Sequence, residues 1–340
     1  MNQNLPVSSS PNLNTFPKLL DDLVSRVGED PAIREKDLGI WQSWTWRQFQ
    51  EEARIIANSL AANGFSRGDK LAVIGDNRPE LYFGIMATQM LGGVPVPIYQ
   101  DSIAEEMVYI LDHAEVRFAI VEDQEQVDKL LSIRDRLSNL EFIIYEDPRG
   151  LRDYEDVGLI SYSSAREQGL LFGRKNPGFV DGEIEKGGAN DLAVMLYTSG
   201  TTGKPKGVML SYENIIATSR SGIEHDRLTA KEKVIAYMPM AWIGDHLFSY
   251  GESLCTGFTV YCPESADTVL QDVREIGPTC FFAPPRIWET ILTTVMVRIE
   301  DAGWLKRKMF KYFMKVAERF GAPLMDGRLV SLKGRLLYGL

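Results

Sequence analysis

The sequence predicts an α/β fold with two βα subdomains built on mainly parallel sheets. Short apolar runs typical of buried strands alternate with helical patterns of ten or more residues, and the alternation occupies both halves of the 340-residue chain. Strands that alternate with such helices form βαβ units, whose strands lie parallel. A hydrophobic content of 44% supplies a sizeable core. We expect a loose tail over residues 1–14, a first subdomain over 15–185 and a second over 186–340.

The first subdomain is expected to begin with a hairpin over residues 32–46. A helix from Thr45 to Asn63 follows, and its apolar residues fall on one stripe: Phe49, Ala53, Ile56, Ala57 and Leu60. Strands and helices then alternate in this order: strand 70–75, helix 79–91, strand 94–97, helix 103–113, strand 118–121, helix 125–137 and strand 142–145. Residues 148–190 are polar and glycine-rich, and one helix is expected near 161–168.

The second subdomain continues the alternation. Its expected elements are strand 192–197, strand 207–210, helix 212–225, strand 234–237, helix 242–253, strand 259–261, helix 266–276, strand 279–282, helix 285–302 and a long helix to about Phe320. The last residues, from Ser331 to Leu340, are expected to begin another strand.

Charge and composition exclude several classes of protein. The net charge of −10 argues against a nucleic-acid-binding protein, which needs a basic face. Cys255, Cys262 and Cys280 lack the spacing of metal ligands, and we expect buried thiols in a reducing compartment. No apolar run reaches the ~18 residues of a membrane-spanning helix. We expect a cytoplasmic protein that is at most peripheral to a membrane.

One polar segment, residues 197–208, stands between two apolar strands. It contains four Ser/Thr hydroxyls, three glycines and two lysines: Thr198, Ser199, Thr201, Thr202, Gly200, Gly203, Gly207, Lys204 and Lys206. Glycines let backbone N–H groups point into one concavity, hydroxyls donate to oxyanions, and ammonium groups neutralise them. This composition predicts a loop that binds a polyphosphate.

The segment is not the P-loop of nucleotide triphosphatases. Gly200 and Gly203 are separated by two residues instead of four, and Pro205 follows Lys204 where that motif needs a hydroxyl for a metal. A P-loop also leads directly into a helix whose N-terminus holds the phosphate. This loop joins two strands, so we expect it to cover a nucleotide as a flap.

Residues 197–208 resemble the signature loop of the adenylate-forming (AMP-binding) superfamily. From about Thr15 to Leu340 the chain is similar in the order of its elements to the N-terminal part of long-chain acyl-CoA synthetases. The resemblance implies the large N-terminal domain of adenylate-forming enzymes, with the C-terminal lid domain absent and the second subdomain truncated at its C-terminal end. It therefore also implies that the chain is an N-terminal fragment, with the catalytic lysine in the missing part.

The reaction implied by the resemblance is activation of a fatty acid by ATP to an acyl-adenylate, followed by transfer to coenzyme A. The implied ATP-binding residues are Thr198, Ser199, Gly200, Thr201, Thr202, Gly203, Lys204 and Lys206, with Thr201 a weak candidate for the Mg²⁺ that accompanies ATP. Two alternatives stay open. The loop could be a solvated linker without a ligand, and Lys206 could be an ordinary charge at a strand edge.

A second candidate region is the segment from Pro239 to His246, which follows a buried strand where α/β sheets form ligand crevices. In the family this region lines the acyl pocket. Trp242 is a candidate wall or gate of that pocket, and His246 a candidate substrate contact. The alternative for Trp242 is an aromatic residue of the core, and the simpler interpretation of His246 is a satisfied core or surface histidine. The residues at this place depart from the family pattern, which leaves the acid open.

The helix from Trp304 to Phe320 interleaves basic and apolar residues. Such a helix can lie on an anionic membrane, which would suit an enzyme that takes fatty acids from a bilayer. The simpler interpretation is a solvated basic face over a packed apolar stripe.

Three functions follow from these observations. The first is the N-terminal portion of a long-chain fatty acid–CoA ligase, with ATP, Mg²⁺ and coenzyme A as its cofactors and co-substrates. The second is an adenylating enzyme for another acid, aryl or linked to a carrier protein. The third is a non-catalytic nucleotide-binding remnant.

We expect that the 340-residue chain alone does not turn over, because the resemblance places the ribose contact and the catalytic lysine beyond Leu340. Exchange of labelled pyrophosphate into ATP measures this. Robust exchange by the 340-residue chain would contradict the expectation.

Overall fold

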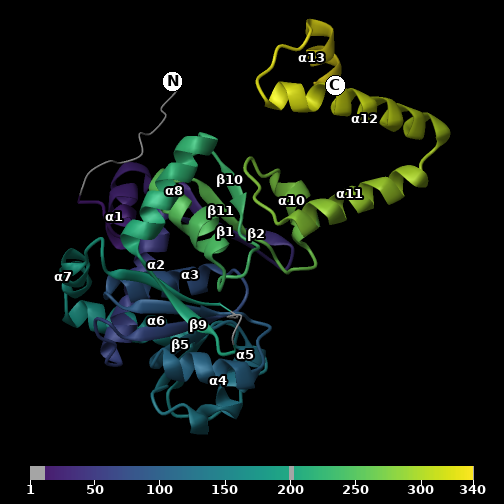
Figure 1. The fold of residues 1–340 in the computed structure, drawn as a ribbon. Helices are drawn as coiled ribbons and strands as arrows, with labels where there is room; N and C mark the ends of the chain where they lie inside the picture. Colours follow the sequence, from purple (N-terminus) through teal and green to yellow (C-terminus); the bar gives the residue numbers. More distant parts are fainter. Residues whose placement is uncertain (1–11, 199–202, 340) are drawn as a thin grey trace. The chain divides into compact units, whose positions relative to one another are not determined.

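The structure is a computed structural model that describes residues 12–198 and 203–339 (Figure 1). It divides into two compact units, and the division falls between Phe281 and Phe282. The first unit contains three sheets, and the second consists of the last helices. The α/β class with mainly parallel sheets is confirmed.

The largest sheet of the first unit is entirely parallel. Its strand order is β4 (Val94–Ile98), β3 (Lys70–Ile74), β5 (Val116–Val121), β6 (Phe142–Tyr145) and β7 (Leu159–Ser161). The helices that connect or follow these strands are α3 (Pro79–Met90), α4 (Ala104–His113), α5 (Gln124–Ser132) and α6 (Tyr162–Lys175). A short 3₁₀ turn, Arg134–Arg136, follows α5.

Strand β3, the second strand of this sheet, lies between two hydrophobic cores. Leu71 and Val73 belong to the core that contains α3 and the helix α2 (Trp46–Ala62). Ala72 and Ile74 belong to the core that contains α4 and α5. Successive residues of a strand point to opposite faces, and a parallel sheet covered on both faces is apolar throughout. This explains why the sequence of β3 is continuously apolar.

A second sheet combines strands from the two ends of the unit. Its order is β10 (Lys233–Ile235), β11 (Thr259–Cys262), β1 (Pro31–Asp37) and β2 (Ile40–Thr45). The expected N-terminal hairpin is present as the antiparallel pair of β1 and β2, and β1 pairs in parallel with β11. The boundary between the two subdomains near residue 185 stays a prediction. The pairing of β1 with β11 places residues from both sides of that boundary in one sheet.

The third sheet is an antiparallel hairpin of β8 (Leu192–Thr198) and β9 (Lys206–Ser211). Ser211 caps the following helix α8 (Tyr212–Asp226) by accepting from the backbone of Asn214. The remaining elements of the unit are α1 (Phe16–Val27), α7 (Phe179–Lys186), α9 (Glu252–Thr256) and α10 (Val269–Ile276).

Several expected elements differ from the structure. Residues 148–190 form β7, α6 and α7 in place of one short helix. The expected helix 242–253 is a π-helix over Asp245–Gly251 continued by α9. The expected strand 279–282 is wrong: only Cys280 forms a bridge, to Val234. Prolines at 278, 284 and 285 bracket this segment and lack the N–H groups that a ladder requires.

The second unit contains α11 (Pro285–Glu300), α12 (Trp304–Met325) and α13 (Leu332–Tyr338). The expectation of a strand after Ser331 is wrong, because these residues form α13. The side chain of Ser331 accepts from the backbone N–H of Gly334 at 3.2 Å and caps this helix. A short apolar run does not by itself distinguish a strand from a helix. Among the described residues, no helix has the length and apolar content to cross a membrane.

The contact between α2 and α6 gives a stability prediction. A Cβ placed on Gly169 of α6 would lie 2.0 Å from the carbonyl oxygen of Ile55, whereas one on Gly182 of α7 meets nothing within 4 Å. Gly169→Ala must separate the two helices, and we expect a loss of about 1–3 kcal/mol in the free energy of unfolding. Gly182→Ala is the matched control and should be neutral or slightly stabilising. Urea unfolding measures both, and equal effects would contradict the packing argument.

Candidate functional site

The β8–β9 hairpin carries both ends of the predicted phosphate loop. Thr198 is the last residue of β8 and lies opposite Lys206, the first residue of β9. Both side chains are exposed, as is that of Lys204. Gly203 has a φ of 122°, a conformation that L side chains rarely adopt. The remaining predicted ligands, Ser199, Gly200, Thr201 and Thr202, lie outside the described residues.

The structure therefore brings Thr198 and Lys206 together at the open end of a hairpin whose strand β8 is largely buried. Ala193, Val194 and Leu196 of β8 belong to the main core. An exposed hydroxyl and an exposed ammonium at the ends of two paired strands are able to donate to an oxyanion. The role of these residues as ATP ligands stays a prediction.

The second candidate segment lies elsewhere in the first unit. Trp242 is partly buried, and its ring lies against Gly244, where a Cβ would approach the ring to 3.0 Å. His246 is only 1% exposed. Its Nε2 lies 2.8 Å from the carbonyl oxygen of Met240, and burial lowers its pKa to about 4. This is the geometry of a neutral core histidine, and a contact with substrate stays a prediction.

The neighbouring residue Asp245 was not singled out in the sequence, although the structure makes it a centre of polar contacts. It is completely buried. Its carboxylate accepts from the hydroxyl of Tyr82 at 2.8 Å and from the amide of Asn77 at 3.1 Å. Burial raises the pKa of Asp245 to about 7, although these hydrogen bonds oppose the rise. The sequence signal for this buried polar centre is an acidic residue inside a mainly apolar segment.

An acidic cleft of about 530 Å³ lies where β5 and β6 end. It is lined by seven carboxylates and three cations, among other residues: Glu35, Asp37, Glu80, Glu122, Glu146, Asp147, Glu264, Lys36, Arg78 and Arg149. Burial raises the pKa of Glu35 to about 7 and that of Glu146 to about 8. An excess of carboxylates disfavours the binding of a polyphosphate, so we do not assign ATP to this cleft.

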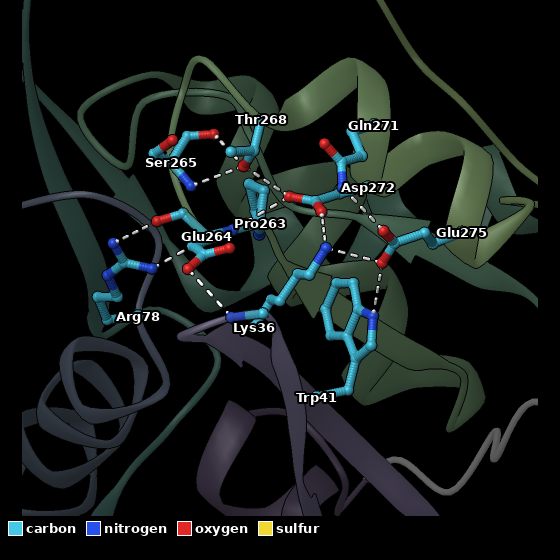
Figure 2. A network of polar contacts seen from close by, with 11 residues as sticks. Lys36, Trp41, Arg78, Pro263, Glu264, Ser265, Thr268, Gln271, Asp272 and Glu275 are labelled. Atoms are coloured by element: carbon cyan, nitrogen blue, oxygen red, sulfur yellow. Dashed lines mark hydrogen bonds and ion pairs between the residues drawn. The ribbon is translucent and has the colours of Figure 1, made fainter.

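The cations at this cleft already have partners. Figure 2 shows the ammonium of Lys36 between Asp272 at 2.9 Å and Glu275 at 2.7 Å, with the indole N–H of Trp41 on the same Glu275. Arg78 donates to the carbonyl oxygens of Pro263 and Glu264. These contacts join segments distant in sequence, and we interpret the cluster as structural.

The described residues do not form a metal site of their own. They contain no group of three or more His, Cys, Asp or Glu side chains that could hold a metal ion. Magnesium that arrives with ATP needs few protein ligands, because it keeps waters and phosphate oxygens in its shell. Thr201, the candidate contact, lies outside the described residues.

Asp245 generates a prediction on pH dependence. Its pKa of about 7 lies above the ordinary 3.8, so the folded state holds a proton that the unfolded state releases between these values. The stability of the wild type should therefore fall relative to Asp245→Asn as the pH rises from about 4 to about 7, and the difference should then level off. Urea unfolding across this range measures it. A difference between wild type and Asp245→Asn that does not change with pH would contradict the prediction.

Comparisons with known proteins agree with the fold and the motif. The family model described as "AMP-binding enzyme" matches residues 20–331. Long-chain-fatty-acid–CoA ligase ACSBG2 of Homo sapiens is 31% identical over 321 residues, which are 92% of this chain and 47% of that protein. ACSBG1 of Rattus norvegicus, named likewise as a long-chain-fatty-acid–CoA ligase, is 28% identical over 89% of this chain and 42% of its own length.

Solved structures show the same fold. The anthranilate CoA ligase AuaEII in complex with anthranoyl-AMP matches with a TM-score of 0.67 and 20% identity, over 82% of this chain and 51% of that chain. The adenylation domain of a carboxylate reductase from Mycobacterium chelonae matches with a TM-score of 0.71 and 20% identity, over 85% of this chain and 48% of that chain. The chain spans about half the length of the curated relatives it matches. Because the family model covers most of its residues, the chain belongs to the AMP-binding enzyme family.

Proposed function

We propose that this chain is part of an enzyme that activates a fatty acid with ATP and transfers the acyl group to coenzyme A. The observation that carries the proposal is the sequence from Tyr197 to Val208 on the β8–β9 hairpin. Its hydroxyls, glycines and lysines suit the β and γ phosphates of ATP. Thr198, Lys204 and Lys206 are the described side chains that we assign to this role.

The chemistry explains why such a loop is needed. An anionic carboxylate must approach a polyanionic phosphate, and pyrophosphate must leave. Catalysis therefore depends on positioning and on the stabilisation of charge, as in other phosphoryl chemistry. Ammonium groups and hydroxyl donors near the leaving phosphates reduce the repulsion between the carboxylate and the phosphates. They also stabilise the negative charge that develops on the leaving pyrophosphate. We assign the charge to Lys204 and Lys206, with Mg²⁺ arriving on the nucleotide.

A long-chain fatty acid is the favoured substrate because the curated relatives at about 30% identity are named as ligases for such acids. Trp242 is the proposed wall of the acyl pocket. His246 is a weaker candidate for contact with the acid, since its ring is buried and already contacts the carbonyl oxygen of Met240. An aryl acid is the alternative, and the likeness in fold to an anthranilate CoA ligase supports it.

Contact with a membrane surface is a further part of the proposal. α12 carries several basic residues, and Trp304, Leu305 and Met309 on it are 70%, 55% and 51% exposed. An exposed basic and apolar helix binds anionic lipid surfaces. Such contact would bring the enzyme to fatty acids dissolved in a bilayer.

ATP binding by this chain tests the phosphate role. Lys206→Ala removes one charge-assisted contact, worth about 1.5–3 kcal/mol, and should weaken ATP binding by roughly ten- to a hundredfold. Lys233→Ala is the matched control, because Lys233 is also an exposed lysine that begins a strand. Isothermal calorimetry measures both variants. Equal affinities in wild type and Lys206→Ala would remove the phosphate role, and no ATP binding by the wild type would favour an unliganded loop.

The acid is identified by thioester formation with coenzyme A by the complete protein. A series of fatty acids of graded length should show the highest kcat/KM for long chains, with benzoate and anthranilate as the aryl comparison. Preference for the aryl acids would establish the alternative substrate. ATP binding without thioester formation from any acid would favour a nucleotide-binding protein without this activity.

A further inference from the structure

The stem of the β8–β9 hairpin is attached to helix α4 by a side-chain contact at its open end. Tyr197 is the residue before Thr198, and its hydroxyl lies 2.7 Å from Nδ1 of His113, within hydrogen-bond distance. The two rings are perpendicular, with centroids 5.9 Å apart. Tyr197 is 7% exposed and belongs to the core that contains α4. The last residue of α4 thus fixes the end of β8.

The opposite strand leaves room for this contact. Tyr197 pairs with Gly207 of β9. A Cβ on Gly207 would lie 3.2 Å from the ring and 3.3 Å from the hydroxyl of Tyr197, closer than most real contacts. A glycine at this place allows the ring of Tyr197 to lie over β9 undisturbed. Tyr197 therefore links both strands of the hairpin to α4, through its contact with His113 and its pairing with Gly207.

The same face of α4 also supports Lys204. Tyr109 lies four residues before His113, so the two side chains are neighbours on the helix surface. Their rings stack with centroids 5.3 Å apart and planes 29° from parallel. The ammonium nitrogen of Lys204 lies 5.0 Å from the centroid of the Tyr109 ring, within the range of a cation–π interaction. A continuous series of contacts therefore runs from β8 through α4 to Lys204.

We propose that Tyr109 is a positioning residue that holds the ammonium of Lys204 ready for the triphosphate. The inference rests on the function proposed above, since it concerns the same lysine. An ammonium has three N–H donors, and a ring takes up only one side of it. The other side remains available to phosphate oxygens. The ring reduces the rotamers that Lys204 explores, so less conformational entropy is lost when the anion binds.

Calorimetry with inorganic tripolyphosphate tests this, because the probe lacks the adenosine and reports on the phosphate contacts alone. The change is Tyr109→Leu, which removes the ring face. Cation–π contacts at exposed sites correspond to about a two- to fivefold change in affinity, so we expect Kd to rise by that factor. Tyr109→Phe keeps the ring and should restore the wild-type Kd. Tyr99→Leu is the control, since Tyr99 is a 38% exposed tyrosine close before α4.

A second measurement follows the contact directly. Reductive methylation with ¹³C keeps the charge on lysine and labels its ammonium for NMR. Methyl groups above an aromatic ring shift to lower ppm, so the Lys204 signal, assigned by its loss in Lys204→Arg, should be shifted in wild type and Tyr109→Phe. It should return to the ordinary lysine position in Tyr109→Leu.

The outcomes separate this inference from the proposed function. A wild type that binds tripolyphosphate with the same Kd as Tyr109→Leu overturns the positioning role and leaves the phosphate loop intact. An unshifted Lys204 signal in the wild type overturns it as well. A wild type that binds neither tripolyphosphate nor ATP overturns the proposed function, and the role of Tyr109 with it.

Discussion

The arrangement of the first unit depends on the guanidinium of Arg78, which stands between its two largest sheets. Arg78 follows β3 of the parallel sheet and donates to Glu122 at the end of β5 at 2.9 Å. It also donates to the carbonyl oxygens of Pro263 and Glu264, just after β11 of the mixed sheet. The planar fork of arginine can serve several acceptors at once, which a lysine at this place could not do. One partly buried side chain thus ties the ends of strands from both sheets.

The contacts of Arg78 also explain the unusual carboxylates around it. Burial is the largest cause of the raised pKa values of Glu35 and Glu146, and the charge of Arg78 offsets only part of it for Glu35. More carboxylates gather at these strand ends than cations can pair. The protein keeps some of them protonated near neutral pH, a less costly state than a buried unpaired charge. A cluster with this composition is better suited to joining sheets than to receiving ATP.

Much of the fold could be predicted because local patterns and tertiary structure agree. The buried strands β3, β5 and β6, the capped helix α2 and the β8–β9 hairpin all follow from continuous apolar runs, one-sided stripes and turn residues. The failures have two different causes. At residues 332–338 the signal is local, since Ser331 caps the helix, but the short apolar run is equally consistent with a strand. At Asp245 the π-helix accompanies contacts with Tyr82 and Asn77, which lie more than 160 positions away in the chain.

The candidate site divides in the same way. The phosphate loop could be predicted from composition, since hydroxyls, glycines and lysines are adjacent in sequence. The support from α4 could not, because His113 and Tyr197 are 84 positions apart. In the sequence His113 is only a residue at the end of a helix, and Tyr109 one aromatic among many. Side chains that act through a neighbour become visible only when the fold brings them together.

The alternation of β3 between two cores has a consequence for the evolution of the chain. Leu71 and Val73 face one interior, and Ala72 and Ile74 face the other. A single residue inserted within this strand would turn the side chains on one side of the insertion to the opposite core, so that side chains would meet a space shaped for others. Length variation among homologous sequences is therefore expected in the loops that flank β3, while the strand itself changes only by substitution.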